Sequence, residues 1–168
     1  MSDLAYEELR AAVKKTPEDY LGAKEDEAFE RLGRALAASA DAQKDEEFIE
    51  SDDAYLEARN RRIERLRHGC EDALRIDGDC IDAQAILALT GEGEPDDALV
   101  RLEQIEQGLD ELAPADGADL WEDAFARPRL RMLASIARTQ LETARYRRAL
   151  ETCERAAALN PADNIGIR

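Results

Sequence analysis

A repeated pattern of small and apolar residues constrains this chain more than any other feature. When the sequence is shifted by 83 residues against itself, LRHGCEDALRIDGD aligns with ALETCERAAALNPAD, so that Cys70 falls on Cys153 and Ala73 on Ala156. A third copy, PDDALVRLEQIEQGL, repeats the same spacing of small and apolar residues. A repeat of this kind predicts a stack of similar helical units rather than one closed bundle.

The apolar residues recur at helical spacing along the whole chain, which predicts an all-α fold. Ala and Leu are abundant, and the runs of Val, Ile and Thr that strands need are absent. Proline, glycine and acidic strings mark the helix ends. A loop or a frayed helix start is expected over 43–53, and loops are expected at GEGEP (91–95) and around 114–117. We expect helices over about 2–15, 17–42, 51–77, 82–90, 95–112, a short one at Trp121, 128–144 and 146–159.

The charge of the chain is strongly negative and unevenly distributed. The formal net charge is −16; residues 1–126 carry 35 acids and 14 bases, whereas residues 127–168 carry 4 acids and 9 bases. The acidic bulk argues against nucleic acid and against anionic membranes as partners. Neither a signal peptide nor a membrane-spanning run is apparent, so we expect a soluble protein in the cytoplasm.

The cysteines, Cys70, Cys80 and Cys153, form no C-x-x-C pair. Their odd number and their spacing suggest neither a disulfide framework nor a zinc site. We expect them to be small buried residues. No metal or other cofactor is expected.

The last copy of the repeat resembles a tetratricopeptide repeat over its full length. That family has the pattern W-x2-L-G-x2-Y, then A-x3-F, then P. In this chain the pattern reads Leu133-x2-Ile136-Ala137-x2-Gln140, then Ala149-x3-Cys153, Ala156 and Pro161. The departures are the missing Trp, Tyr and Phe. The resemblance implies antiparallel helix hairpins stacked as a tetratricopeptide-like right-handed α-solenoid.

A narrower resemblance covers roughly residues 51–168. The strings ALRIDGDCIDAQAILAL and LNPADNIGIR, together with Trp121 and the stretch 127–131, are similar to bacterial tetratricopeptide proteins related to the suppressor-of-tumorigenicity-seven family. Gly78 stands where that family has proline. The resemblance implies the fold rather than a biochemical activity. Proteins of this group continue past the terminal arginine, so we expect the natural chain to be longer.

The repeats lead to an expected domain organisation. The long helices predicted over residues 17–76 match the repeat length poorly, and residues 1–50 are expected to form an atypical N-terminal helical cap. Residues 51–168 are expected to hold tetratricopeptide-like repeats at about 51–78, 80–112 and 128–161. We expect all of these parts to form one continuous domain.

The basic end of the chain contains the first candidate binding residues. Arg131, Ser135 and Arg138 lie three and four residues apart and so share one side of the helix predicted over 128–144. The resemblance implies that this helix lines a concave groove and that these side chains point into it. Arginine forks suit carboxylates, so an acidic peptide or a peptide C-terminus is a plausible ligand. The alternative is that these arginines offset acids of the same molecule or are simply solvated.

The equivalent groove positions of the middle repeat are Asp82, Ala85, Ile86 and Leu89. An apolar floor at these positions would accept a ligand side chain. The alternative is that this short apolar helix is simply buried in the core.

The sequence does not indicate an enzyme. His68 is the only histidine, and no serine or cysteine motif accompanies it. Acidic pairs such as Asp96-Asp97 lack the spacing of a calcium loop and are typical of helix first turns. We therefore expect a non-enzymatic module that binds a protein, a peptide or a partner helix. The alternatives are self-association as a homo-oligomer, a scaffold arm of a larger protein, or an enzyme with an unrecognised active site.

Overall fold

A computed structural model describes residues 22–109, 119–123 and 126–167 of the chain. The chain divides into two compact units, Met1–Cys80 and Ile81–Arg168. Over the described residues both units consist of helices and turns without a strand, which confirms the all-α class. The helix predicted over 2–15, the start of the next one at Pro17 and the loop around 114–117 lie outside the described residues.

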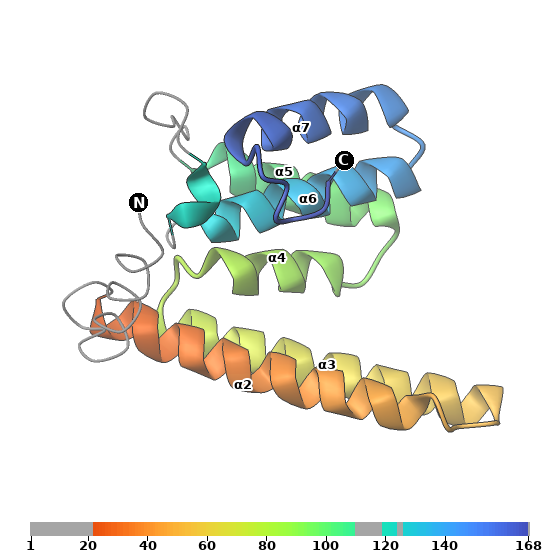
Figure 1. Ribbon diagram of the computed structural model, residues 1–168. Coiled ribbons are helices and arrows are strands. Elements are labelled where there is room, and N and C mark those ends of the chain that lie inside the picture. Colours follow the sequence, from red (N-terminus) through yellow and green to blue (C-terminus); the bar gives the residue numbers. More distant parts are fainter. Residues whose placement is uncertain (1–21, 110–118, 124–125, 168) are drawn as a thin grey trace. The chain divides into compact units, whose positions relative to one another are not determined.

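The described part of the first unit is a hairpin of two long helices. Helix α2 spans Ala23–Glu46 and helix α3 spans Asp52–Ile76, and the two lie side by side in Figure 1. The side chain of Ser51 caps α3 by accepting a hydrogen bond from the Ala54 amide at 3.5 Å, which accounts for the predicted start of this helix. The domain boundary expected after residue 50 falls at the turn between these two helices, inside this unit.

Small residues bring the two helices of the hairpin close together. Ala28 and Leu32 of α2 are buried, as are Cys70 and Ala73 of α3. A Cβ atom added at Gly69 would lie 2.3 Å from the Cβ atom of Ala35. The two backbones therefore approach more closely than any other residue at position 69 would permit without a shift.

Charged residues add to this contact at both ends of the hairpin. The buried Glu46 carboxylate lies 2.8 Å from Arg62 Nε, and Asp72 is ion-paired with Arg31 and, at 2.5 Å, with Arg75. The hydrogen bond from Arg31 lowers the pKa of Asp72, although burial opposes this effect. The predicted end of α2 at residue 42 is wrong, because the helix continues to the ion-paired Glu46.

The second unit contains shorter helices in the expected order. They are α4 (Ile81–Leu89), α5 (Pro95–Gln107), the 3-10 helix η2 (Leu120–Glu122), α6 (Arg127–Glu142) and α7 (Tyr146–Leu159). The predicted starts at Pro95 and Tyr146 are confirmed. The predicted end of α5 at residue 112 is wrong, because the helix ends at Gln107 and Gly108 follows it.

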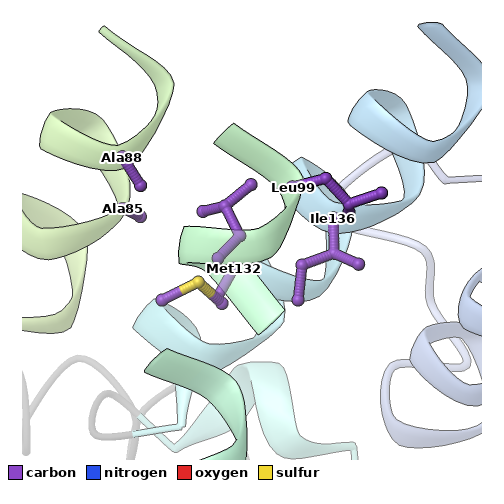
Figure 2. Packing of buried hydrophobic residues seen from close by; sticks show 6 residues of the cluster. Ala85, Ala88, Leu99, Met132 and Ile136 are labelled. Carbon is purple, nitrogen blue, oxygen red and sulfur yellow. The ribbon is translucent and has the colours of Figure 1, made fainter. Parts of the chain in front are cut away.

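Helix α6 lies at the centre of the second unit. It packs against α4, α5 and α7, and α4 also packs against α5. Figure 2 shows where α4, α5 and α6 meet, with Met132 and Ile136 of α6 near Leu99 of α5 and the alanines of α4. The full cluster of buried residues is Ala85, Ala88, Leu99, Leu102, Met132 and Ile136. Only Arg138, Leu141 and Glu142 of α6 are classed as exposed.

Candidate interaction surface

The three candidate residues of α6 do share one face of the helix. The Ser135 hydroxyl donates a hydrogen bond to the Arg131 carbonyl oxygen at 3.0 Å, one helical turn earlier. Arg138 continues this face and is exposed. Its guanidinium makes no hydrogen bond or ion pair with any residue in the described part of the chain. Within the described residues, Arg138 is thus the unpaired charged member of this face.

Arg131, in contrast, is already paired within the molecule. Its Nε atom lies 2.9 Å from Asp82 Oδ1, and its Nη2 atom donates to Asp82 Oδ2, so the arginine binds the carboxylate in a two-pronged arrangement. The side chain of Asp82 is 17% exposed and that of Arg131 is 41% exposed. For Arg131 the structure thus supports the alternative of intramolecular pairing, with a partner in α4 that the sequence pattern did not identify.

The candidate residues of α4 divide between core and surface. Ala85 is 7% exposed and belongs to the buried cluster, so the alternative that it is a core residue holds. Ile86 is half-buried. Leu89 is 44% exposed, which makes it the most accessible of the apolar candidates.

Helices α4 and α6 place their most accessible candidate residues, Leu89 and Arg138, at the same height along the helix axes. Figure 1 shows α4 and α6 running in the same direction. Leu89 lies two turns beyond Asp82, and Arg138 lies two turns beyond Arg131, so the Asp82–Arg131 pair sets Leu89 level with Arg138. We call Asp82, Leu89, Arg131, Ser135 and Arg138 the α4–α6 face. It offers one apolar side chain, one neutral ion pair and one guanidinium that has no partner in the described part of the chain.

A second row of contacts, which the sequence did not predict, links α5 to α7. Asp96 pairs with Arg145 at 2.5 Å, Glu103 with Arg148 at 2.8 Å, and Glu106 with Arg155 at 3.0 Å. These helices border a pocket of about 300 Å³ whose floor includes Ile136 of α6. Three arginines of the basic end are thus matched by acids of α5. The sequence does show that α5 is rich in acidic residues and that the segment of α7 is rich in arginines. It does not show which acid pairs with which arginine.

The buried side chain of Gln140 in α6 also contacts residues of α5 and α7. Its side chain is 3% exposed; its Nε2 atom donates to Glu103 Oε1 at 3.3 Å, and its Oε1 atom accepts from Thr152 Oγ1 at 2.9 Å. Both ends of the amide are therefore satisfied, as a buried polar group requires. Gln140 occupies the position where the tetratricopeptide pattern has tyrosine. This departure from the pattern is the feature of the sequence that could have pointed to Gln140.

Asp119 is a further residue that the sequence reading missed. Its carboxylate accepts hydrogen bonds from Asn160 Nδ2 at 2.8 Å, from the Ala162 amide at 3.1 Å and from the Trp121 amide at 2.9 Å. Burial tends to raise the pKa of Asp119, but these hydrogen bonds together outweigh it and hold the pKa below its usual value. We call these contacts the Asp119 clasp.

The clasp lies where three of the elements on which the narrower resemblance depends come together. Arg127 donates from Nε to the Trp121 carbonyl oxygen at 2.7 Å, and its guanidinium carbon lies 5.4 Å from the centre of the indole ring. Trp121, the stretch that begins at Arg127 and the LNPAD string around Asn160 thus meet at one end of the second unit. Asn160 Nδ2 and the Asp119 carboxylate are satisfied by the chain itself, whereas Asn160 Oδ1 is buried and has no hydrogen-bond partner among the described residues.

Among the described residues, no three His, Cys, Asp or Glu side chains converge as metal ligands would. None of the described helices combines the length and the apolar character that crossing a bilayer requires. Comparison with protein-family models, with curated proteins and with solved structures finds no match for this chain. The resemblance to tetratricopeptide proteins therefore stays a prediction.

Proposed function

We propose that the second unit is a tetratricopeptide-like interaction module that binds a peptide or a partner helix on the α4–α6 face and performs no catalysis. The observation that carries this proposal is the packing of α6, which contacts both helices of the preceding hairpin as well as its own partner α7. A stack of helix hairpins needs this arrangement, since each new hairpin must bury the face that the previous one leaves open.

The burial of equivalent positions supports the same proposal. Ala98 of α5 and Ala149 of α7 are 7% and 1% exposed, and they hold the same place in two copies of the repeat. The small side chain at this place lets the second helix of each hairpin approach the first. Two copies that bury the same position in the same way are expected of a repeat architecture.

The chemistry of the face indicates the kind of ligand. Arg138 has no partner among the described residues, and a guanidinium binds a carboxylate in a planar, two-pronged arrangement. Leu89, level with it on α4, offers an apolar contact. Arg131 is a poorer site, because a ligand carboxylate has to compete with Asp82. We therefore propose a segment that carries an acidic residue next to an apolar one.

An array of ten-residue peptides, each with an acidic residue beside an apolar one, tests this proposal with the intact chain as the probe. Arg138→Glu should weaken binding to the selected peptides at least tenfold, since a loss of about 1.4 kcal/mol corresponds to a factor of ten. Arg147→Glu is the matched control, because its side chain is 93% exposed on α7, away from the face. Equal binding by wild type and Arg138→Glu would refute the placement of the site.

A cytoplasmic location and the absence of catalysis stay predictions. Self-association is a second candidate function, because large apolar side chains lie exposed on α2 of the first unit: Phe29 is 61% exposed and Leu36 is 42% exposed.

A further inference from the structure

Helix α2 carries a second apolar stripe beside the one that faces α3. Phe29, Gly33, Leu36 and Ala40 follow one another at spacings of four, three and four residues, so they lie on one side of the helix. All four are exposed, and Phe29 and Leu36 are the large members. We call these residues the α2 stripe. The core contact with α3 uses a different set, which includes Ala28 and Leu32.

The α2 stripe alternates large and small side chains. Phe29 and Leu36 are separated by Gly33, and Ala40 follows Leu36. A Cβ atom built at Gly33 meets no atom within 4 Å, so the space beside the glycine is open. A surface of bulges and hollows in this order fits a helix with the same order read in the opposite direction.

The chain itself supplies such a helix. If two α2 helices cross antiparallel about a twofold axis between residues 34 and 35, Phe29 lies over Ala40 of the second copy. Leu36 then lies over Gly33 of the second copy. Each bulge therefore meets a hollow, and the contact is isologous, which is the usual form of a homodimer interface.

The charges beside the stripe agree with this register. Asp26 lies in the first turn of α2, and Lys44 lies in the last turn, where its Nζ atom is also 2.8 Å from the exposed Asp41 carboxylate. The two positions lie at the same angle around the helix, because they are five full turns apart. In the antiparallel arrangement, Asp26 lies within one residue of the level of Lys44 of the second copy, and this opposite-charge contact occurs twice. We propose that a second copy of this chain covers the α2 stripe and forms an antiparallel dimer through α2.

Sedimentation equilibrium of the full chain tests the proposal. The wild type should be a dimer at tens of micromolar, and Leu36→Lys should raise the dissociation constant at least tenfold, because it places a charge in the α2 stripe. Leu150→Lys on α7 is the matched control, since Leu150 is 58% exposed in the other unit, and it should leave the dissociation constant unchanged. Circular dichroism will show that Leu36→Lys keeps its helices.

A charge exchange then tests the register. Lys44→Asp should weaken the dimer, because it opposes Asp26 with a like charge, and adding Asp26→Lys should restore the wild-type dissociation constant. A monomeric wild type, or a dimer that neither Leu36→Lys nor Lys44→Asp weakens, overturns the proposal. A dimer that Leu150→Lys disrupts instead also overturns it. None of these outcomes bears on peptide binding by Arg138, which lies in the other unit.

Discussion

The two units solve the problem of helix packing in different ways. In the described part of the first unit, α2 and α3 meet along a single line, so the buried apolar residues are few and Leu32 is the one large side chain among them, and the ion pairs of Glu46 and Asp72 lie beside them. In the second unit, α6 is surrounded by three helices, and it can therefore bury large side chains such as Met132. A third neighbour turns a line of contact into a core.

The difference teaches where the stability of each unit arises. The hairpin depends on the close approach of its backbones at Gly69, since its interface has little apolar volume to bury. The second unit depends on burial of apolar surface, and its polar contacts at Gln140 and Asp119 fix the register of the helices. The same kind of substitution should therefore have different effects in the two units.

The largest effect is expected from a cavity in the second unit. Leu102 is 0% exposed, and Leu102→Ala should lower the free energy of unfolding by about 2–5 kcal/mol. Trp121 is the only tryptophan, so its fluorescence during urea unfolding reports on this unit alone. Val100→Ala on the same helix is the control, because Val100 is 52% exposed, and it should change the stability by less than about 1 kcal/mol. Similar losses in both variants would contradict the proposed core.

A smaller effect is expected where the hairpin is tightest. Gly69→Ala should destabilise the first unit by about 1–3 kcal/mol, although alanine favours a helix, because its methyl group meets Ala35. Urea unfolding followed by circular dichroism measures the loss. Adding Ala35→Gly removes the opposing methyl group and should recover most of it. If the double variant is less stable than Gly69→Ala alone, the contact between residues 69 and 35 is not the cause of the destabilisation.

The smallest effect is expected at the Asp119 clasp, and it depends on pH. Because the folded state lowers the pKa of Asp119, the ionised carboxylate stabilises the second unit above the usual value of about 3.8, and this contribution is lost as the pH falls through the lowered value. Asp119→Asn should cost about 1 kcal/mol at pH 7. The free energies of unfolding of wild type and variant, measured by Trp121 fluorescence, should become more similar as the pH falls from 5 to 2. If the difference in free energy of unfolding stays constant over this pH range, the ionised Asp119 carboxylate is not the stabilising group.

Much of this fold could be predicted from the sequence, because the helix ends are determined locally. Ser51 caps α3, Pro95 opens α5, and Tyr146 and Leu159 bound α7, and each of these positions was predicted from its neighbours alone. The end of α2 was not predicted. An acidic string from residue 43 suggested a loop, whereas Glu46 is held in the helix by Arg62, which lies 16 residues further along the chain.

The candidate site was predictable only in part for the same reason. That Arg131, Ser135 and Arg138 share a face follows from helical periodicity. That Asp82 occupies Arg131 does not, because these residues lie 49 positions apart and their meeting depends on how α4 packs against α6. Gln140 and Asp119 were missed because their partners lie far away along the chain, and periodicity carries no information about such partners.

The Asp119 clasp has a consequence for the way this chain resists degradation. The α6–α7 hairpin is closed at one end by the residues between the two helices, and its other end would be free to fray if Asp119 did not hold Asn160 and Ala162. A protease that cuts at the end of α7 therefore has to break the hydrogen bonds of Asn160 and Ala162 to Asp119, which lies more than forty residues earlier in the chain. Because Asp119 directly precedes η2, proteolysis from that side is coupled to the loss of η2.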